Sequence, residues 1–104
     1  MAQESPDDSL GEFASKFAEL TEDLLYGDIW NRPGLSPRDR SLVTVGVLVS
    51  LYRTEQLETH FTRALSNGVS RDELIELMTH VGFYAGWPCP STGLRILRAM
   101  EGSP

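Results

Sequence analysis

The stretch that decides the fold runs from Thr54 to Ser70 and reads TEQLETHFTRALSNGVS. Thr54 can cap a helix, acidic residues occupy the first turn, and Gly68 can adopt the left-handed conformation that ends a helix. One face of this helix is apolar and comprises Leu57, Phe61, Ala64 and Leu65. A neighbouring stripe is polar and comprises Arg53, Gln56, His60 and Arg63. The spacing therefore predicts an amphipathic helix that places one imidazole among long polar side chains beside an apolar seam.

Helical patterns continue on both sides of this stretch. From residue 9 to 26, Phe13, Phe17, Leu20 and Leu24 recur at helical spacing. A second helix starts at Ser36-Pro37, and its apolar run from Leu42 to Leu51 predicts burial on most sides. Ser70 and Glu73 form a capping box that opens a helix to about Ala85. Residues 87–91 (WPCPS) are expected to be a stiff junction before a last helix over 91–101.

These patterns predict an all-α fold, a compact bundle of about five helices joined by short loops. At 104 residues, with 40% hydrophobic content, the chain is long enough for one core. We expect residues 1–8, which are polar, to be disordered and residues 9–104 to form a single domain.

The composition excludes several classes of function. A net charge of -6 argues against a nucleic-acid partner. No segment is apolar enough to span a membrane and the acidic N-terminus does not resemble a secretory signal, so we expect a soluble, cytoplasmic protein. The single cysteine, Cys89, rules out an internal disulfide. The two histidines are twenty positions apart without helical metal-site spacing, so no metal site is expected.

Four segments resemble the carboxymuconolactone decarboxylase family, whose fold is shared with alkylhydroperoxidase-D-like proteins. They are 27–35 (GDIWNRPGL), 38–44 (RDRSLVT), Leu57 and His60 followed by 63–70 (RALSNGVS), and 83–88 (FYAGWP). The resemblance extends from about Phe17 to Met100, about four fifths of the chain, with the segments in the family's order. The resemblance implies the alkylhydroperoxidase-D-like fold.

The redox branch of that fold resembles C-x-x-C-x-x-x-H. Here the two cysteine positions fall on Arg53 and Gln56, and an acid of that branch falls on Ser41. Without a pair of thiols, disulfide redox chemistry cannot proceed. This departure favours the decarboxylase side of the family over a peroxidase-like protein.

The resemblance implies a cofactor-free carboxy-lyase that acts on a small carboxylated lactone or a related cyclic acid. His60 is the predicted catalytic residue, as proton donor or oxyanion partner, because histidine exchanges protons near neutral pH. Arg40 and Arg53 are predicted to bind carboxylates, since a guanidinium can hold one through two parallel hydrogen bonds. The remaining predicted substrate-binding residues are Trp87, Tyr84, Trp30 and His80.

The predicted site residues could instead have purely structural roles. The arginines can be solvated or paired with an acid such as Glu55, the aromatic residues can pack at a core or a subunit contact, and His80 can pair with Glu76. A non-catalytic binding or assembly module is a third candidate function. The resemblance also implies a homo-oligomer, a trimer or hexamer, whose pocket a neighbouring chain could complete.

Overall fold

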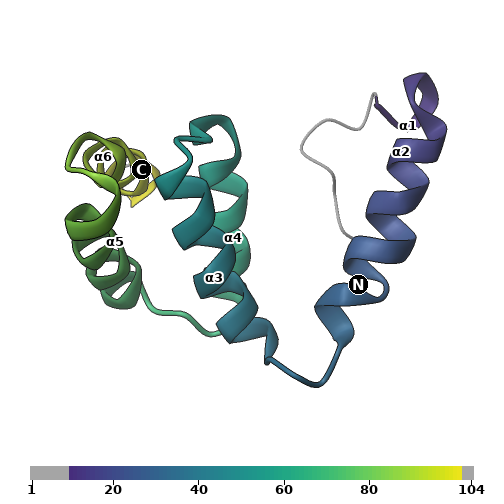
Figure 1. Ribbon diagram of the computed structural model, residues 1–104, viewed down its shortest axis with the longest axis horizontal. Coiled ribbons are helices and arrows are strands. Elements are labelled where there is room, and N and C mark those ends of the chain that lie inside the picture. The colour runs from purple at the N-terminus through teal and green to yellow at the C-terminus, as the bar shows by residue number, and fades with distance from the viewer. Residues whose placement is uncertain (1–9, 102–104) are drawn as a thin grey trace. The chain divides into compact units, whose positions relative to one another are not determined.

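The computed structural model describes residues 10–101 of the chain. It divides at Pro37 into two compact units, residues 1–37 and 38–104, and each unit is described here by itself. All regular secondary structure in the described part is helical, which confirms the all-α prediction (Figure 1). The expected disorder of residues 1–8 lies outside the described residues, and the single-domain prediction stays a prediction.

The N-terminal unit contains α1 (Leu10–Phe13), α2 (Ser15–Leu20), a π-helical turn (Thr21–Tyr26) and a 3₁₀ turn (Ile29–Asn31). One continuous helix was predicted over residues 9–26, but Ala14 has φ -132° and ψ 71°, which interrupts it. The Asn31 amide donates to the carbonyl oxygens of Tyr26 and Gly27 at 3.2 and 3.1 Å and ties the 3₁₀ turn to the π-helical one. The apolar stripe is exposed, from 47% at Leu20 to 89% at Phe13.

Helix α3 (Pro37–Ser50) begins with proline at its first position, as predicted. Its core-facing residues recur every four positions: Ser41, Val45 and Val49 are at most 1% exposed. The prediction that this helix is buried on most sides is wrong, because Val43 and Val47 are 57% and 47% exposed. Only one face of α3 packs against the rest of its unit, and composition alone does not reveal which valines lie on it.

The predicted central helix is present as a 3₁₀ turn (Thr54–Gln56) followed by α4 (Leu57–Ser66). Thr54 does not cap this helix: the residue before α4 is Gln56, and no side chain there accepts a capping hydrogen bond. The other end agrees with the sequence, since Gly68 follows α4 with φ 99°, a conformation that favours glycine. The buried residues of α4 are Leu57, His60, Phe61 and Ala64.

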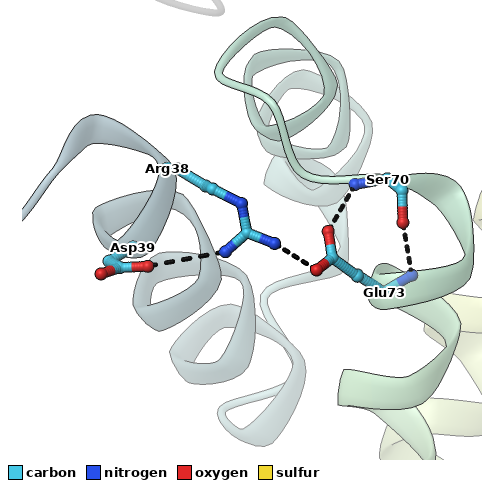
Figure 2. Close-up of polar contacts among 4 residues, drawn as sticks. All are labelled: Arg38, Asp39, Ser70 and Glu73. Carbon is cyan, nitrogen blue, oxygen red and sulfur yellow. Dashed lines mark hydrogen bonds and ion pairs between the residues drawn. The ribbon is translucent and has the colours of Figure 1, made fainter.

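Helix α5 (Arg71–Ala85) opens with the predicted capping box. The Glu73 amide donates to Ser70 Oγ at 3.0 Å, and the Ser70 amide donates to Glu73 Oε1 at 2.9 Å. The other carboxylate oxygen of Glu73 pairs with Arg38 at the start of α3, as Figure 2 shows. The Ser70 amide, and then the Arg38 guanidinium, lower the pKa of Glu73 below its usual value. The start of α5 is thus tied to the start of α3.

The last helix, α6 (Pro88–Glu101), begins three residues earlier than predicted. The expected stiff junction instead forms the first helical turn, because proline is tolerated where a backbone N–H has no partner within the helix. The Trp87 indole lies against Gly82, where an added Cβ would come within 2.9 Å of ring carbons. Gly93 similarly lies against Met78, with 2.7 Å between a built Cβ and Sδ. The glycines at these two positions thus allow α6, and Trp87 just before it, to approach α5 closely.

Helices α3 to α6 form the second unit (Figure 1), and their buried side chains form one apolar core. The core is formed by buried residues from these helices and from the loop before α5: Val45, Val49, Leu57, Phe61, Ala64, Val69, Leu74, Met78 and Leu97. His60 and Ser41 are the buried polar residues of the described chain. A polar site inside this unit therefore starts from those two side chains.

Candidate functional site

His60 is placed by α4 at the edge of the core. The same face of α4 carries three fully buried residues, Leu57, Phe61 and Ala64. Because these residues pack into the core, the imidazole on that face is buried as well. The side chain is 9% exposed, and its Nδ1 is buried without a hydrogen-bond partner among the described residues. Buried polar atoms are almost always hydrogen-bonded, so an unpartnered ring nitrogen marks a candidate functional site.

The environment of His60 disfavours its charged form. Burial, and then the positive charge of Arg63, lowers the pKa of His60 from 6.5 to about 4. At neutral pH the imidazole is therefore uncharged, with one nitrogen able to donate a hydrogen bond and the other able to accept one. A neutral imidazole can donate to a developing oxyanion without first losing or gaining a proton.

A polar stripe extends from His60 along α4. Arg63 and Asn67 follow at spacings of three and four, so the three residues share one side of the helix, and both are half-buried. The Asn67 amide donates to Ser41 Oγ on α3 at 3.0 Å, and Ser41 is 1% exposed. This hydrogen bond joins α3 and α4 at the far end of the stripe.

The two arginines predicted to bind carboxylates have different surroundings. Arg40 is half-buried and directly precedes Ser41 on α3. Arg53 is exposed and precedes the 3₁₀ turn at Thr54. Arg40 therefore has the more desolvated environment, in which binding to a carboxylate is stronger.

The aromatic candidates form separate pairs. His80 stacks on Tyr84 at 5.1 Å between ring centroids, and it forms no ion pair with Glu76 in the described chain. Trp87 meets Phe83 edge to face at 5.6 Å. Trp30 belongs to the N-terminal unit, where it is half-buried and lies 5.9 Å from the Tyr26 ring. The exposed fractions of Tyr84 and Trp87 are 82% and 61%.

A groove of about 490 Å³ lies between α5 and α6, and none of the predicted site residues lines it. Its lining comprises Arg71, Ile75, Ser91, Leu94, Arg95, Leu97 and Arg98. Among the described residues no three His, Cys, Asp or Glu side chains gather as potential metal ligands. Over the same part of the chain, no helix combines the length and the apolar character needed to cross a lipid bilayer.

Arg63, Ser41 and Asn67 are not among the sequence-predicted site residues. The sequence could have indicated Arg63 and Asn67, because positions 60, 63 and 67 fall on one side of a helix. Nothing comparable pointed to Ser41, whose burial depends on how α3 packs.

The lowered pKa of His60 predicts a pH-dependent stability. Its pKa in the folded state, about 4, lies below the unfolded value of 6.5, so between these values the unfolded chain binds more protons. The free energy of unfolding should therefore fall as the pH is lowered from 6.5 to 4, by about 3 kcal/mol from this group. Urea unfolding at pH 7.5 and pH 4.5 measures the change.

The His60→Gln variant isolates this contribution, because carboxyl groups that titrate in the same range are retained. We expect the variant to lose less stability than the parent between the two pH values. If both proteins lose the same free energy of unfolding between the two pH values, the pKa of His60 is not lowered by folding.

Comparison with known proteins places the chain. The model of the "Carboxymuconolactone decarboxylase family" matches residues 15–99. A "4-carboxymuconolactone decarboxylase" of Acinetobacter baylyi is 37% identical over 89 residues, which are 86% of this chain and 66% of that protein. A "Nitrosuccinic acid decarboxylase npaB" of Metarhizium robertsii is 36% identical over 70 residues, 67% of this chain and 49% of that protein. The chain thus spans less than two thirds of the length of either relative. It belongs to the carboxymuconolactone decarboxylase family.

Proposed function

We propose that the protein is a carboxy-lyase for a small carboxylic acid that needs no cofactor to accept electrons, with His60 in its active site. The observation that carries this proposal is the nine-tenths buried imidazole whose Nδ1 has no partner among the described residues. Two decarboxylases among the relatives support the reaction class.

The names of those relatives suggest a common substrate chemistry. One denotes a carboxylated lactone and the other a nitro-substituted succinic acid. In both molecules the electron pair left by the departing carbon dioxide can move into a group of the substrate, a conjugated lactone carbonyl or a nitro group. We infer that this protein acts on a carboxylated lactone or another acid that carries its own electron acceptor. A proton then adds to a carbon of the resulting anion.

A protein assists such a reaction mainly by stabilising the charge that develops on the acceptor oxygen. Neutral His60 is suited to this role, because its N–H can donate to that oxygen in a site with little water. Its lowered pKa favours this role over that of a protonated acid in the free protein. Leu57, Phe61 and Ala64 supply the apolar surroundings in which such a hydrogen bond is strong.

The other parts of the proposed site are anchors and walls. Arg40 is the preferred carboxylate-binding residue of the two predicted, because it is half-buried and adjacent to Ser41, while Arg53 is exposed. The proposed apolar wall comprises Trp87 and Tyr84, and His80 is a further proposed polar group of the pocket. Trp30, in the N-terminal unit, stays a predicted substrate-binding residue.

We also propose a homo-oligomer, a trimer or hexamer, in which a neighbouring chain could complete the pocket. Large apolar side chains on α3 and α5 support this, since Val43 is 57% exposed and Phe83 is 77% exposed. Burying such side chains between subunits would stabilise the assembly.

The test is carbon dioxide release by the full chain from 4-carboxymuconolactone and from nitrosuccinate, each compared with its spontaneous decarboxylation. We expect turnover of at least one acid without added metal or cofactor. Binding of both acids without turnover would favour the non-catalytic module instead. Peroxide turnover that disappears in the Cys89→Ser variant would favour a redox protein.

A further inference from the structure

Arg63 lies one helical turn after His60 and is not among the arginines that the sequence suggested as carboxylate anchors. It is half-buried, and its positive charge acts on the imidazole. On the same side of α4, Asn67 is held by Ser41, so the stripe that carries Arg63 is fixed against α3 at one end. The helical spacing thus places a partly desolvated guanidinium on the same side of α4 as a buried imidazole.

We propose that Arg63 binds the carboxylate that the substrate retains, next to His60. This inference rests on the proposed function and assigns Arg63 to the second carboxylate of an acid that loses one carboxylate and keeps another. A guanidinium holds a carboxylate through two parallel hydrogen bonds, and this pairing is stronger in a half-buried position than in water.

The distinction between the two carboxylates has a physical reason. A cation on the departing carboxylate would stabilise the charge that must leave it as carbon dioxide forms, and would therefore slow the reaction. A cation on the retained carboxylate stabilises the ground state and the transition state alike, so it contributes to binding without opposing the chemistry.

Binding at Arg63 would also affect His60. In the free protein the guanidinium opposes protonation of the imidazole, in addition to the effect of burial. A carboxylate on Arg63 cancels that positive charge, so the pKa of His60 rises when the ligand binds.

Steady-state kinetics of the parent and of Arg63→Gln, with 4-carboxymuconolactone and with nitrosuccinate, test the anchor. We expect KM to rise about 10- to 100-fold in Arg63→Gln, with a smaller change in kcat, because a charge-assisted hydrogen-bonded pair is lost. Arg63→Lys should recover part of the loss, because it keeps the charge but not the two parallel hydrogen bonds. Arg95→Gln, an exposed arginine on α6, is the matched control and should keep the parental KM. An unchanged KM in Arg63→Gln, with the parent active, would overturn the proposal.

A second measurement does not depend on turnover. The pKa of His60 is followed by NMR with and without succinate, a dicarboxylate that lacks the electron acceptor. We expect succinate to raise this pKa in the parent and Arg95→Gln but not in Arg63→Gln, whose ligand-free value is already higher than the parent's. If the parent releases no carbon dioxide from either acid but shows this response, the proposed reaction fails and Arg63 remains an anion anchor. If succinate leaves the pKa of His60 unchanged in the parent, the role of Arg63 is wrong.

Discussion

Replacing His60 with alanine should lower the kcat for decarboxylation about 100- to 10,000-fold, the range expected when a group that donates to the transition state is removed. The physical reason is the position of the imidazole: it is nine-tenths buried, neutral and unpartnered at Nδ1 among the described residues. A hydrogen bond to a developing oxyanion is worth most in such surroundings, because little water competes for it. Continuous measurement of carbon dioxide release at saturating substrate gives kcat directly.

Two further variants separate catalysis from folding. His60→Gln keeps a polar side chain that can donate a hydrogen bond, and it should recover part of the loss if His60 acts as an oxyanion partner. Ser66→Ala changes an exposed residue on the same helix and should leave kcat unchanged. If His60→Ala remains folded by circular dichroism and keeps the parental kcat, His60 is not catalytic.

Replacing Phe61 with alanine should destabilise the protein by about 3–5 kcal/mol, the usual cost of removing a phenyl ring from a packed core. Phe61 is fully buried and belongs to the core shared by α3 to α6. Because it neighbours His60 on α4, its loss leaves a cavity beneath the proposed site. Urea unfolding at neutral pH, followed by tryptophan fluorescence and circular dichroism, measures the change.

Phe17→Ala is the matched control for this experiment. Phe17 is 61% exposed and belongs to the N-terminal unit, outside the core shared by α3 to α6. We expect a loss of about 0.5 kcal/mol or less, the usual range for a substitution at the surface. Similar losses for the two variants would mean that the core does not lie where α4 places it.

Most of the helices could be predicted from the sequence because their signals are local. The capping box at Ser70 and Glu73 and the glycine after α4 act through residues a few positions apart, and both are present. The errors occurred where a local signal had two interpretations. Pro88 and Pro90 suggested a junction, yet they begin a helix, since proline is compatible with a first helical turn.

In the candidate site, the sequence predicted which residues share a stripe but not which of them are buried. His60, Gln56 and Arg53 belong to one predicted stripe, yet His60 is buried while Arg53 and Gln56 are exposed. The 3₁₀ turn at Thr54–Gln56 accounts for part of this difference, because it changes the helical period just before α4. The valines of α3 illustrate the same limit, since residues of one type alternate between core and surface.

The sequence by itself determined the helical class, the positions of most helices and the family, because periodicity, caps and motifs are properties of neighbouring residues. Only the tertiary structure decided which face of each helix is buried. That packing buries His60 and joins Asn67 to Ser41, whereas Arg63 lies on the same side of α4 as His60 through helical spacing alone. The packing also lowers the pKa of the imidazole, because desolvation depends on the side chains that other helices place around it, and no local pattern specifies them.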